Sequence, residues 1–317
     1  IKKHKSFKKI FEFEGVNTSS LFLPRLWRSI VLWFPHLLCL ERSVSSITEK
    51  YKPNLVLLYC FEFSYGRAII NGTKKIDGVK LIGIQHGPIT PMKLLYSGDS
   101  RELTSNQSTH CSVPLPDIFA LDGEIAYNIL NKRGIEKFFL NITGPMRLDN
   151  VWDFAREKNI KIDYTSKNQK ILVAPGHNDT EFIVPLAIQA IEGTNYRLTI
   201  KSHPKVPQKY FDSIISKYTN TINPNQIEVA KKGTIYSYMV NHDIFLTSYS
   251  SAGVEAIVFD LPIILLNSNR IPDMSLFNKW NKKILSANNP KQLKSHLELL
   301  SNDVRFRNNY QKILYTI

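Results

Sequence analysis

The sequence predicts an α/β protein built from two parallel-sheet domains, and three observations support this. Short apolar runs rich in β-branched residues alternate with helix-like stretches along nearly the whole chain, a pattern typical of parallel strands covered by helices. The chain has 317 residues, a length that suits two domains of about 150 residues better than one. A charged segment without strand rhythm, 150–169, divides the pattern into two halves.

The first half, 1–149, is predicted to form an N-terminal domain. Its apolar runs predict a buried sheet, and its polar segment 97–116 is a long loop of the kind that usually serves in binding. The predicted strands are 54–60, 79–85, 117–121 and 138–143, and the predicted helices are 65–75 and 123–133.

The second half repeats the alternation after the predicted linker, 150–169. We assign 170–300 to a C-terminal domain and 301–317 to a helical tail. Several of its strands are continuous apolar runs, which is typical of strands buried on both faces. The predicted strands are 170–174, 196–201, 226–229, 243–247 and 262–266, and the predicted helices are 180–192, 208–218, 234–240 and 251–259.

Composition excludes several classes of protein. Hydrophobic residues make up 43% of the chain, which is too many for a disordered or low-complexity protein. The net charge of +14 indicates an anionic partner, such as a phosphorylated small molecule, an acidic membrane surface or nucleic acid. Three widely spaced cysteines support neither a disulfide framework nor a zinc site, so we predict a reducing, cytoplasmic setting.

The most apolar stretch, 21–40, is not predicted to cross a membrane. Arg25 and Arg28 interrupt it, and it never reaches 18 uncharged residues. Two interpretations stay open. We favour a helix of the protein core over an interfacial helix that inserts Trp27, Trp33 and Phe34 among lipid headgroups.

The ends of the predicted strands are the places to look for a binding site, because ligands of open parallel sheets sit at the carboxyl edge. Gly176 and His177 follow the strand 170–174, at a turn where backbone N–H groups and a helix start favour an anion. Lys201 ends the next strand and His203 and Pro204 follow it, and the lysine and histidine can donate hydrogen bonds to a phosphate. A plain turn and a surface histidine are the structural alternatives.

A hydroxyl-rich segment follows the strand 243–247. Ser248, Ser250 and Ser251 precede a small-residue helix that contains Gly253, so hydroxyl and N–H groups there can hold a phosphate. Glu255, one turn into that helix, can accept hydrogen bonds from sugar hydroxyls. The structural alternative is an N-cap serine on a helix that packs against the sheet.

Two candidates for a general base lie in the first half. Glu62 follows the strand 54–60, and His86 follows the strand 79–85 between Gln85 and Gly87. Both side chains can take a proton near neutral pH when the surroundings adjust their pKa. We favour Glu62 as the base and His86 as a substrate contact, with the reverse assignment left open. We assign Gln85 and Gly87 to an acceptor site.

With these strand-end motifs, the chain resembles glycosyltransferases of the GT-B type that build bacterial capsules and other surface polysaccharides. The resemblance implies two Rossmann-like domains that face a central cleft, with acceptor binding in the first and nucleotide-sugar binding in the second. It also places Arg147 at the cleft, in a run that resembles the domain crossover. The matching segments, which span most of 53–266, are GIQHG at 83–87, NITGPMRLD at 141–149, ILVAPG at 171–176, IKSHP at 200–204 and DIFLTSYSSAGVEAIVFDLPIIL at 243–265.

The pairing of His203-Pro204 with Ser250-Ser251 is similar to motifs of sialyltransferases, Kdo transferases and CDP-glycerol polymerases. The resemblance implies a metal-independent glycosyltransferase without a cofactor, a CMP-sugar donor, and a glycan or lipid-linked glycan acceptor at the inner face of the cytoplasmic membrane. Alternatives are a polyol-phosphate transferase, a UDP- or dTDP-sugar enzyme, a nucleotide-sugar 2-epimerase, or a non-catalytic carbohydrate- or nucleotide-binding module. We expect no nucleic acid partner, because no RNP, zinc-finger or helix-turn-helix signature is present.

Overall fold

The structure is a computed structural model of the 317-residue chain. It divides into two compact units, which are described separately. Unit 1 comprises Ile1–His86 and Leu95–Gly144, and unit 2 comprises Gly87–Leu94 and Pro145–Ile317. The residues that the structure describes are 10–96, 100–103, 113–158, 169–176, 178–203, 206–218, 220–230, 232–267, 275, 277 and 283–315.

Unit 1 contains a four-stranded parallel sheet. The strands pair in chain order, β3-β4-β5-β6, with Leu57 opposite Ile82 and Gly83 opposite Phe119. Short helical turns at Leu94–Tyr96 and Lys137–Phe139 join the larger elements. The elements are β3 (Leu55–Tyr59), α4 (Ser64–Lys74), β4 (Lys80–Ile84), α5 (Ser100–Leu103), β5 (Ile118–Leu121), α6 (Glu124–Lys132) and β6 (Leu140–Ile142).

A tight turn joins β3 to α4 and places Glu62 at the carboxyl edge of this sheet. Cys60 adopts a φ of 62° there, in the left-handed region that side chains rarely occupy. The start of α4 lies directly against the turn, because a Cβ at Gly66 would be 2.5 Å from the Cys60 carbonyl oxygen. Only glycine at position 66 allows this approach. The sequence had predicted the strand and the helix but not the close turn.

Unit 2 contains a six-stranded parallel sheet, which confirms the predicted α/β class with two parallel sheets. Its strand order is β12-β11-β10-β7-β8-β9. Counted along the chain, this is the 3-2-1-4-5-6 order of the doubly wound fold. Four strands are almost wholly buried, as their apolar runs predicted. The strands are β7 (Lys170–Ala174), β8 (Arg197–Lys201), β9 (Ile227–Ala230), β10 (Ile244–Thr247), β11 (Ile263–Leu266) and β12 (Ser286–Ala287).

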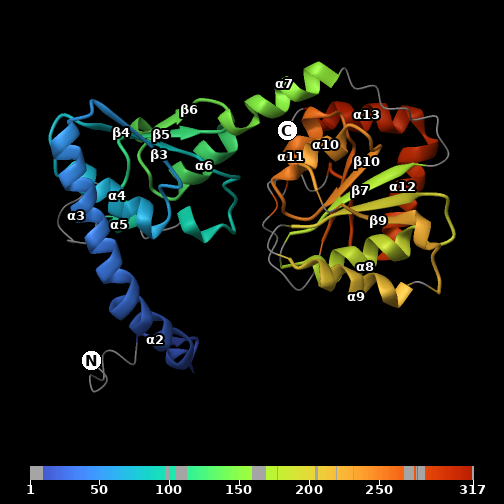
Figure 1. The fold of residues 1–317 in the computed structure, drawn as a ribbon, viewed down its shortest axis with the longest axis horizontal. Coiled ribbons are helices and arrows are strands. Elements are labelled where there is room, and N and C mark those ends of the chain that lie inside the picture. Colours follow the sequence, from blue (N-terminus) through green and yellow to red (C-terminus); the bar gives the residue numbers. More distant parts are fainter. Residues whose placement is uncertain are drawn as a thin grey trace. The chain divides into compact units, whose positions relative to one another are not determined.

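Helices cover both faces of this sheet. Figure 1 shows α8 and α9 along one face and α10, α11 and α13 along the other. Tyr310 of α13 is buried and donates a hydrogen bond to the Ile263 carbonyl at 2.5 Å, so the predicted tail 301–317 packs onto unit 2. The helices are α7 (Asp149–Lys158), α8 (Thr180–Ala190), α9 (Gln208–Ile215), α10 (Ile235–Met239), α11 (Ala252–Val258), α12 (Pro290–Asn302) and α13 (Val304–Leu314).

Helix α7 occupies the first part of the segment 150–169, which the sequence assigned to a linker. Leu148, just before α7, and Val151 within it are buried in the hydrophobic core of unit 2. Both belong to the same cluster as the strands β7 and β10. The first half of the predicted linker is therefore part of unit 2, and the charged residues of α7 form its exposed side.

A long N-terminal helix corrects the prediction that the stretch 21–40 belongs to the core. It follows a hairpin of β1 (Glu12–Phe13) and β2 (Val16–Asn17). Its parts are α2 (Ser19–Arg28), the π-helical turn η1 (Ser29–Trp33) and α3 (Phe34–Tyr51), and neither α2 nor η1 has a buried residue. Among the described residues, this is the one helix whose length and composition would allow it to cross a membrane.

The far end of α3 fixes this helix to unit 1. A Cβ at Gly72 of α4 would be 2.4 Å from the Glu41 carbonyl oxygen and 2.9 Å from Cβ of Val44. Thr48 is the one buried residue of α3. Figure 1 shows α3 beside α4, while α2 extends away from the sheet of unit 1. The apolar periodicity of 21–40 predicted a helix correctly but could not show what would cover it.

The buried His242 predicts a pH-dependent stability. Its Nδ1 lies 2.6 Å from the Tyr238 carbonyl oxygen, which fixes the proton on Nδ1, and its Nε2 accepts from the Thr199 hydroxyl at 2.8 Å. Burial lowers the pKa of His242, although the Tyr238 hydrogen bond and Glu228 oppose this. Below about pH 6.5 the unfolded chain takes up a proton that the folded chain does not. The free energy of unfolding therefore decreases as the pH is lowered, by up to about 1.4 kcal/mol per pH unit.

Urea unfolding between pH 7.5 and pH 5.5 measures this effect. His242→Gln should be less stable than the parent protein at pH 7.5 and should lose part of the decline toward pH 5.5. His36→Gln is the matched control, because His36 is exposed. An equal pH dependence in the parent and His242→Gln proteins would show that His242 does not carry the effect.

Candidate functional site

The two strands at which the order of the unit 2 sheet reverses are β7 and β10. They are hydrogen-bonded neighbours, with Thr247 opposite Ala174 at their carboxyl ends. Ligands of doubly wound folds bind outside the carboxyl ends of the strands at such a switch point, because the two following loops diverge there. Here these loops are joined, since the Ser248 hydroxyl donates a short hydrogen bond to Oδ2 of Asp179.

Gly176 and Tyr249 shape the same edge. A Cβ at Gly176 would lie 2.6 Å from the Tyr249 hydroxyl oxygen, so glycine is needed there for the tyrosine ring to pack. The Thr180 hydroxyl donates to the Gly176 carbonyl at 2.9 Å and fixes the start of α8. Burial raises the pKa of Tyr249, and the charge of Asp179 raises it further. Gly176 therefore has a packing role at this edge in addition to its proposed role in anion binding.

The end of β8 contributes Lys201 and His203. Both are half-buried, and β8 is the neighbour of β7, with Ile200 opposite Val173. The Lys201 ammonium lies 5.7 Å from the centre of the Tyr238 ring, within cation–π range. Two predicted site residues, His177 and Pro204, lie outside the described residues. The described members of the predicted site thus gather at the carboxyl ends of three adjacent strands, β10, β7 and β8.

The segment before α11 contains the two adjacent predicted serines. Ser250 and Ser251 are half-buried, and the Ser250 hydroxyl oxygen accepts a hydrogen bond from the Ala252 N–H at 3.2 Å. Gly253 is buried, and a Cβ there would be 2.7 Å from the Phe277 ring. Close packing against Phe277 therefore accounts for this glycine.

Glu255 of α11 and Arg147 carry opposite charges that interact electrostatically within unit 2. Burial raises the pKa of the Glu255 carboxyl, while the positive charge of Arg147 lowers it, and the net effect is a rise. Both side chains are half-buried. The sequence placed Arg147 with an acceptor and Glu255 with a nucleotide sugar, and the structure brings the two charges together within one unit.

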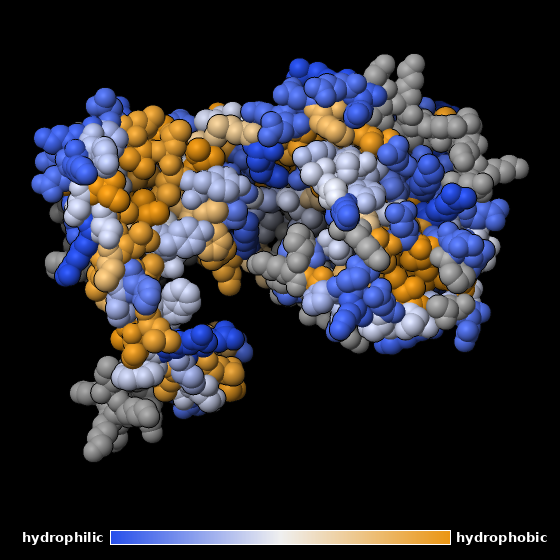
Figure 2. Space-filling model, viewed as in Figure 1, coloured by the Kyte–Doolittle hydropathy of each residue, from blue (hydrophilic) through white to orange (hydrophobic). Residues whose placement is uncertain are grey.

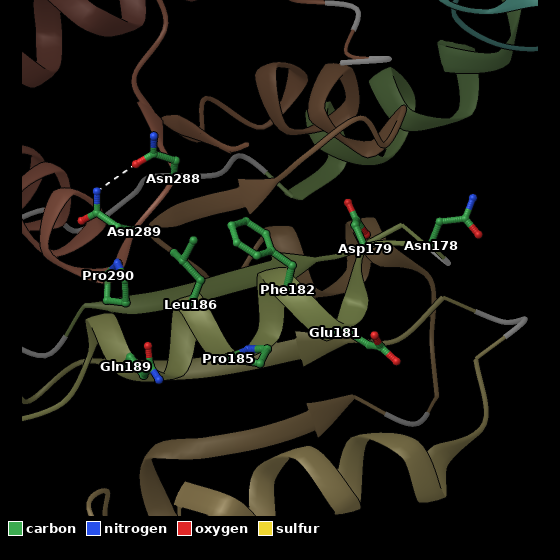
Figure 3. A pocket seen from close by; sticks show the side chains of 10 residues that line it. All are labelled: Asn178, Asp179, Glu181, Phe182, Pro185, Leu186, Gln189, Asn288, Asn289 and Pro290. Atoms are coloured by element: carbon green, nitrogen blue, oxygen red, sulfur yellow. Dashed lines mark hydrogen bonds between the residues drawn. The ribbon is translucent and has the colours of Figure 1, made fainter. Parts of the chain in front are cut away.

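A groove of about 430 Å³ runs along α8 in unit 2. Figure 3 shows Phe182 and Leu186 of α8 pointing toward Asn288 and Asn289, with Asp179 at the end of the helix that lies at the switch point. The Asn289 side chain donates to the Asn288 side chain at 2.8 Å and caps α12 by accepting from the Gln292 N–H at 2.9 Å. The groove could not be predicted from the sequence, because β12 is only two residues long and carries no strand pattern.

The two predicted bases of unit 1 are in contact. His86 Nδ1 forms a short ion pair or hydrogen bond with Oε1 of Glu62. Tyr96 donates its hydroxyl to the same Oε1 at 2.9 Å and lies 3.4 Å from His86 Nδ1. A carboxylate oxygen can only accept, so Nδ1 carries a proton, and Nε2 presents a lone pair when the imidazole is neutral. The three residues form a chain in which the histidine is the outer member.

The surroundings distinguish the two side chains. Glu62 is buried, with a side chain that is 2% exposed, whereas the His86 side chain is 22% exposed. Burial alone would raise the pKa of Glu62, but the hydrogen bonds and the charge of His86 outweigh it and lower the pKa. Burial beside that carboxylate raises the pKa of Tyr96. The rings of Phe63 and Tyr59 flank His86, at centroid distances of 5.4 and 5.7 Å.

Gln85 and Gly87, predicted for an acceptor site, lie on either side of His86. Gln85 is buried, and its side-chain oxygen accepts from the Asp122 N–H at 3.0 Å, so it stabilises the turn after β5. Gly87 has room for a side chain, since its Cβ would be no nearer than 3.4 Å to the Lys93 ammonium. The structure thus gives Gln85 a structural task within unit 1.

Tyr96, Tyr249 and Asp179 stand at these sites without having been predicted as site residues. Tyr96 is 34 positions from Glu62, in a segment with no strand or helix pattern, so the sequence carries no signal for their contact. Tyr249 lies within the serine-rich segment, of which only Ser248, Ser250 and Ser251 were predicted as site residues. Within the described ranges no three His, Cys, Asp or Glu side chains cluster as metal ligands would.

Several solved structures have an architecture similar to that of this chain. The chain is 13% identical to the putative UDP-N-acetylglucosamine 2-epimerase of Listeria monocytogenes, with a TM-score of 0.59, over 88% of this chain and 73% of that chain. The UDP-GlcNAc 2-epimerase of Neisseria meningitidis, bound to UDP-GlcNAc, gives 13% identity and a TM-score of 0.57 over 87% and 74% of the two chains. The chain has a GT-B fold. This confirms the predicted fold, with two Rossmann-like domains.

A further similar structure is HepE of Anabaena in complex with UDP and glucose, with 9% identity and a TM-score of 0.52 over 86% of this chain and 76% of that chain. No protein-family model and no curated protein sequence matches the chain. At these identities the likeness establishes the fold alone.

Proposed function

We propose that this protein is an enzyme that acts on a nucleotide-activated sugar, with the nucleotide phosphate held at the switch point of unit 2. The observation that carries the proposal is the position of Lys201, His203 and Ser248 at the ends of β8 and β10, the two strands that flank β7. Ammonium, imidazole and hydroxyl groups donate to phosphate oxygens, and the net charge of +14 favours an anionic ligand. Glu255, at the helix that follows, is suited to accept from sugar hydroxyls.

A uridine nucleotide is the first candidate for the nucleotide that binds at this site. The resemblance of the His203-Pro204 and Ser250-Ser251 motifs had favoured a CMP-sugar. Structures similar to this chain instead contain UDP-GlcNAc or UDP with glucose. That similarity supports UDP over CMP as the bound nucleotide, and direct binding measurements distinguish the two.

We further propose that His86 transfers the proton in the reaction and that Glu62 and Tyr96 position it. This exchanges the roles favoured from sequence. The buried Glu62 accepts a hydrogen bond from Nδ1 of His86. This leaves Nε2 at the more exposed end of the three hydrogen-bonded side chains, where a substrate proton can reach it. A buried carboxylate that orients a histidine in this way also stabilises the imidazolium formed after proton uptake.

The leading reaction is 2-epimerisation of a nucleotide sugar, because structures similar to this chain include two 2-epimerases of UDP-GlcNAc, one of them putative. Inverting a carbon that bears hydrogen requires that the C–H bond break and re-form on the other face. A positioned histidine is suited to this step. Glycosyl transfer to a glycan hydroxyl is the second candidate, favoured by the His203-Pro204 and Ser250-Ser251 motifs; there the same histidine would take the acceptor proton.

Proton NMR of the protein with UDP-GlcNAc in D₂O tests the leading reaction. We expect a second set of anomeric signals, together with loss of the C2 proton signal as deuterium from solvent replaces it. A matched incubation with CMP-sugars and a glycan acceptor tests transfer through release of CMP. If CMP is released only when acceptor is present and the UDP-sugar stays unchanged, transfer replaces epimerisation. If neither substrate changes, the enzymatic proposal fails.

A further inference from the structure

The N-terminal helix of unit 1 exposes large apolar side chains that nothing in the described structure covers. Among α2, η1 and the start of α3, eight large apolar residues are each between 47% and 67% exposed. Figure 2 shows hydrophobic surface around this helix beside hydrophilic side chains. We call these eight the aromatic-rich helix surface: Leu21, Phe22, Trp27, Ile30, Val31, Leu32, Trp33 and Phe34.

This surface is separate from the part of the helix that packs on the protein. Glu41, Val44 and Thr48 of α3 meet α4, where Gly72 permits the close approach. The helix is therefore held firmly at one end, while its other end presents its side chains outward. An apolar patch of this kind on a folded unit marks an interaction site.

Positive charge accompanies the apolar side chains. Arg25 and Arg28 are three residues apart on α2, so they lie on the same side of the helix, and both are exposed. The sequence places five lysines among the first nine residues, just before the hairpin, within a chain of net charge +14. Basic residues beside tryptophan and phenylalanine on one helix are typical of segments that lie in the interface of an anionic bilayer.

We propose that this surface docks the protein onto an anionic lipid bilayer, with the helix lying in the headgroup region and not spanning the membrane. The uncharged run between Arg28 and Glu41 has 12 residues, which spans only about 18 Å, against roughly 30 Å for the hydrocarbon core. Charge argues against a second copy of the chain as the occupant, because it would bring the arginines and lysines of both copies together.

Vesicle sedimentation with the full chain tests this. Phosphatidylcholine vesicles are compared with vesicles in which about a third of the lipid is phosphatidylglycerol. We expect the protein to sediment with the anionic vesicles, to stay largely in the supernatant with the neutral ones, and to be released by high salt. Arg25→Gln and Arg28→Gln should each weaken the apparent affinity about fivefold. Arg305→Gln, an exposed arginine of α13, is the matched control.

The apolar part is tested by Trp27→Ser with Trp33→Ser, which should reduce anionic-vesicle binding at least tenfold. Phe138→Ser, at another exposed aromatic of unit 1, should leave it unchanged. Three results overturn the proposal. Equal binding to neutral and anionic vesicles removes the anionic requirement, and resistance to both salt and alkaline carbonate extraction indicates a spanning helix. A monomer–dimer equilibrium abolished by the tryptophan changes, without vesicle binding, indicates a second copy.

Discussion

His86→Ala is expected to lower turnover by about 10²–10⁴-fold while leaving nucleotide binding unchanged. The reason is the chain of hydrogen bonds in unit 1, in which the buried Glu62 accepts from Nδ1 of His86 and directs the Nε2 lone pair outward. Removing the imidazole removes the group proposed to move the proton and leaves the proposed phosphate contacts of unit 2 intact. His36→Ala is the matched control, an exposed histidine of the N-terminal helix.

Glu62→Gln distinguishes a positioning role from a catalytic one. The amide keeps the shape of the carboxylate but no longer carries the charge that stabilises an imidazolium, so we expect kcat to fall by about 10–10²-fold with little change in KM. Tyr96→Phe removes the other hydrogen bond to Oε1 and should cost less, because His86 keeps its carboxylate partner. If Glu62→Gln abolishes turnover while His86→Ala stays active, the carboxylate is the base and the roles return to those favoured from sequence.

His203→Ala is expected to weaken nucleotide affinity by about ten- to a hundredfold, because it removes a charged hydrogen bond worth about 1.5–3 kcal/mol. His203 is half-buried at the end of β8 and outside the hydrophobic core of unit 2, so the variant should keep its thermal stability. Lys201→Ala should act in the same direction. Lys291→Ala, at an exposed lysine of α12, is the control for removal of positive charge alone.

Three outcomes would contradict the proposed phosphate site. Unchanged affinity in His203→Ala would place the phosphate elsewhere. A large fall in melting temperature without nucleotide present would make the residue structural. An equal loss of affinity in Lys291→Ala and Lys201→Ala would indicate a general electrostatic attraction and not a built site.

The parallel strands could be predicted because each lies in a short apolar run that alternates with helix-like stretches. Strands β7, β10 and β11 are buried on both faces, so every residue in them must be apolar or paired, and the sequence shows this directly. The order in which the strands pair could not be predicted from such runs. It depends on contacts between distant segments, such as Asp243, whose carboxylate accepts from the Lys170 N–H at 2.7 Å.

The candidate site divides in the same way. Its location at strand ends followed from the general rule for parallel sheets, and the structure places Lys201, His203 and Ser248 there. The contacts within it did not follow from sequence. Glu62, His86 and Tyr96 meet only after folding, and the difference in burial between the Glu62 carboxylate and the half-buried His86 leaves no pattern in the chain. The sequence left open whether the N-terminal helix belongs to the core or lies exposed, because an apolar stretch predicts a helix but does not show what covers it.

Isothermal titration with UDP, at low salt and without divalent metal, tests the central claim that unit 2 binds a nucleotide at its switch point. The full chain should bind UDP in a one-to-one complex, more tightly than CMP. His203→Ala should lose about ten- to a hundredfold in affinity, and Ser248→Ala, which breaks the link to Asp179 between the two loops, should lose affinity as well. Absence of binding by UDP and CMP alike, or UDP affinity unaltered in both variants, would contradict the account.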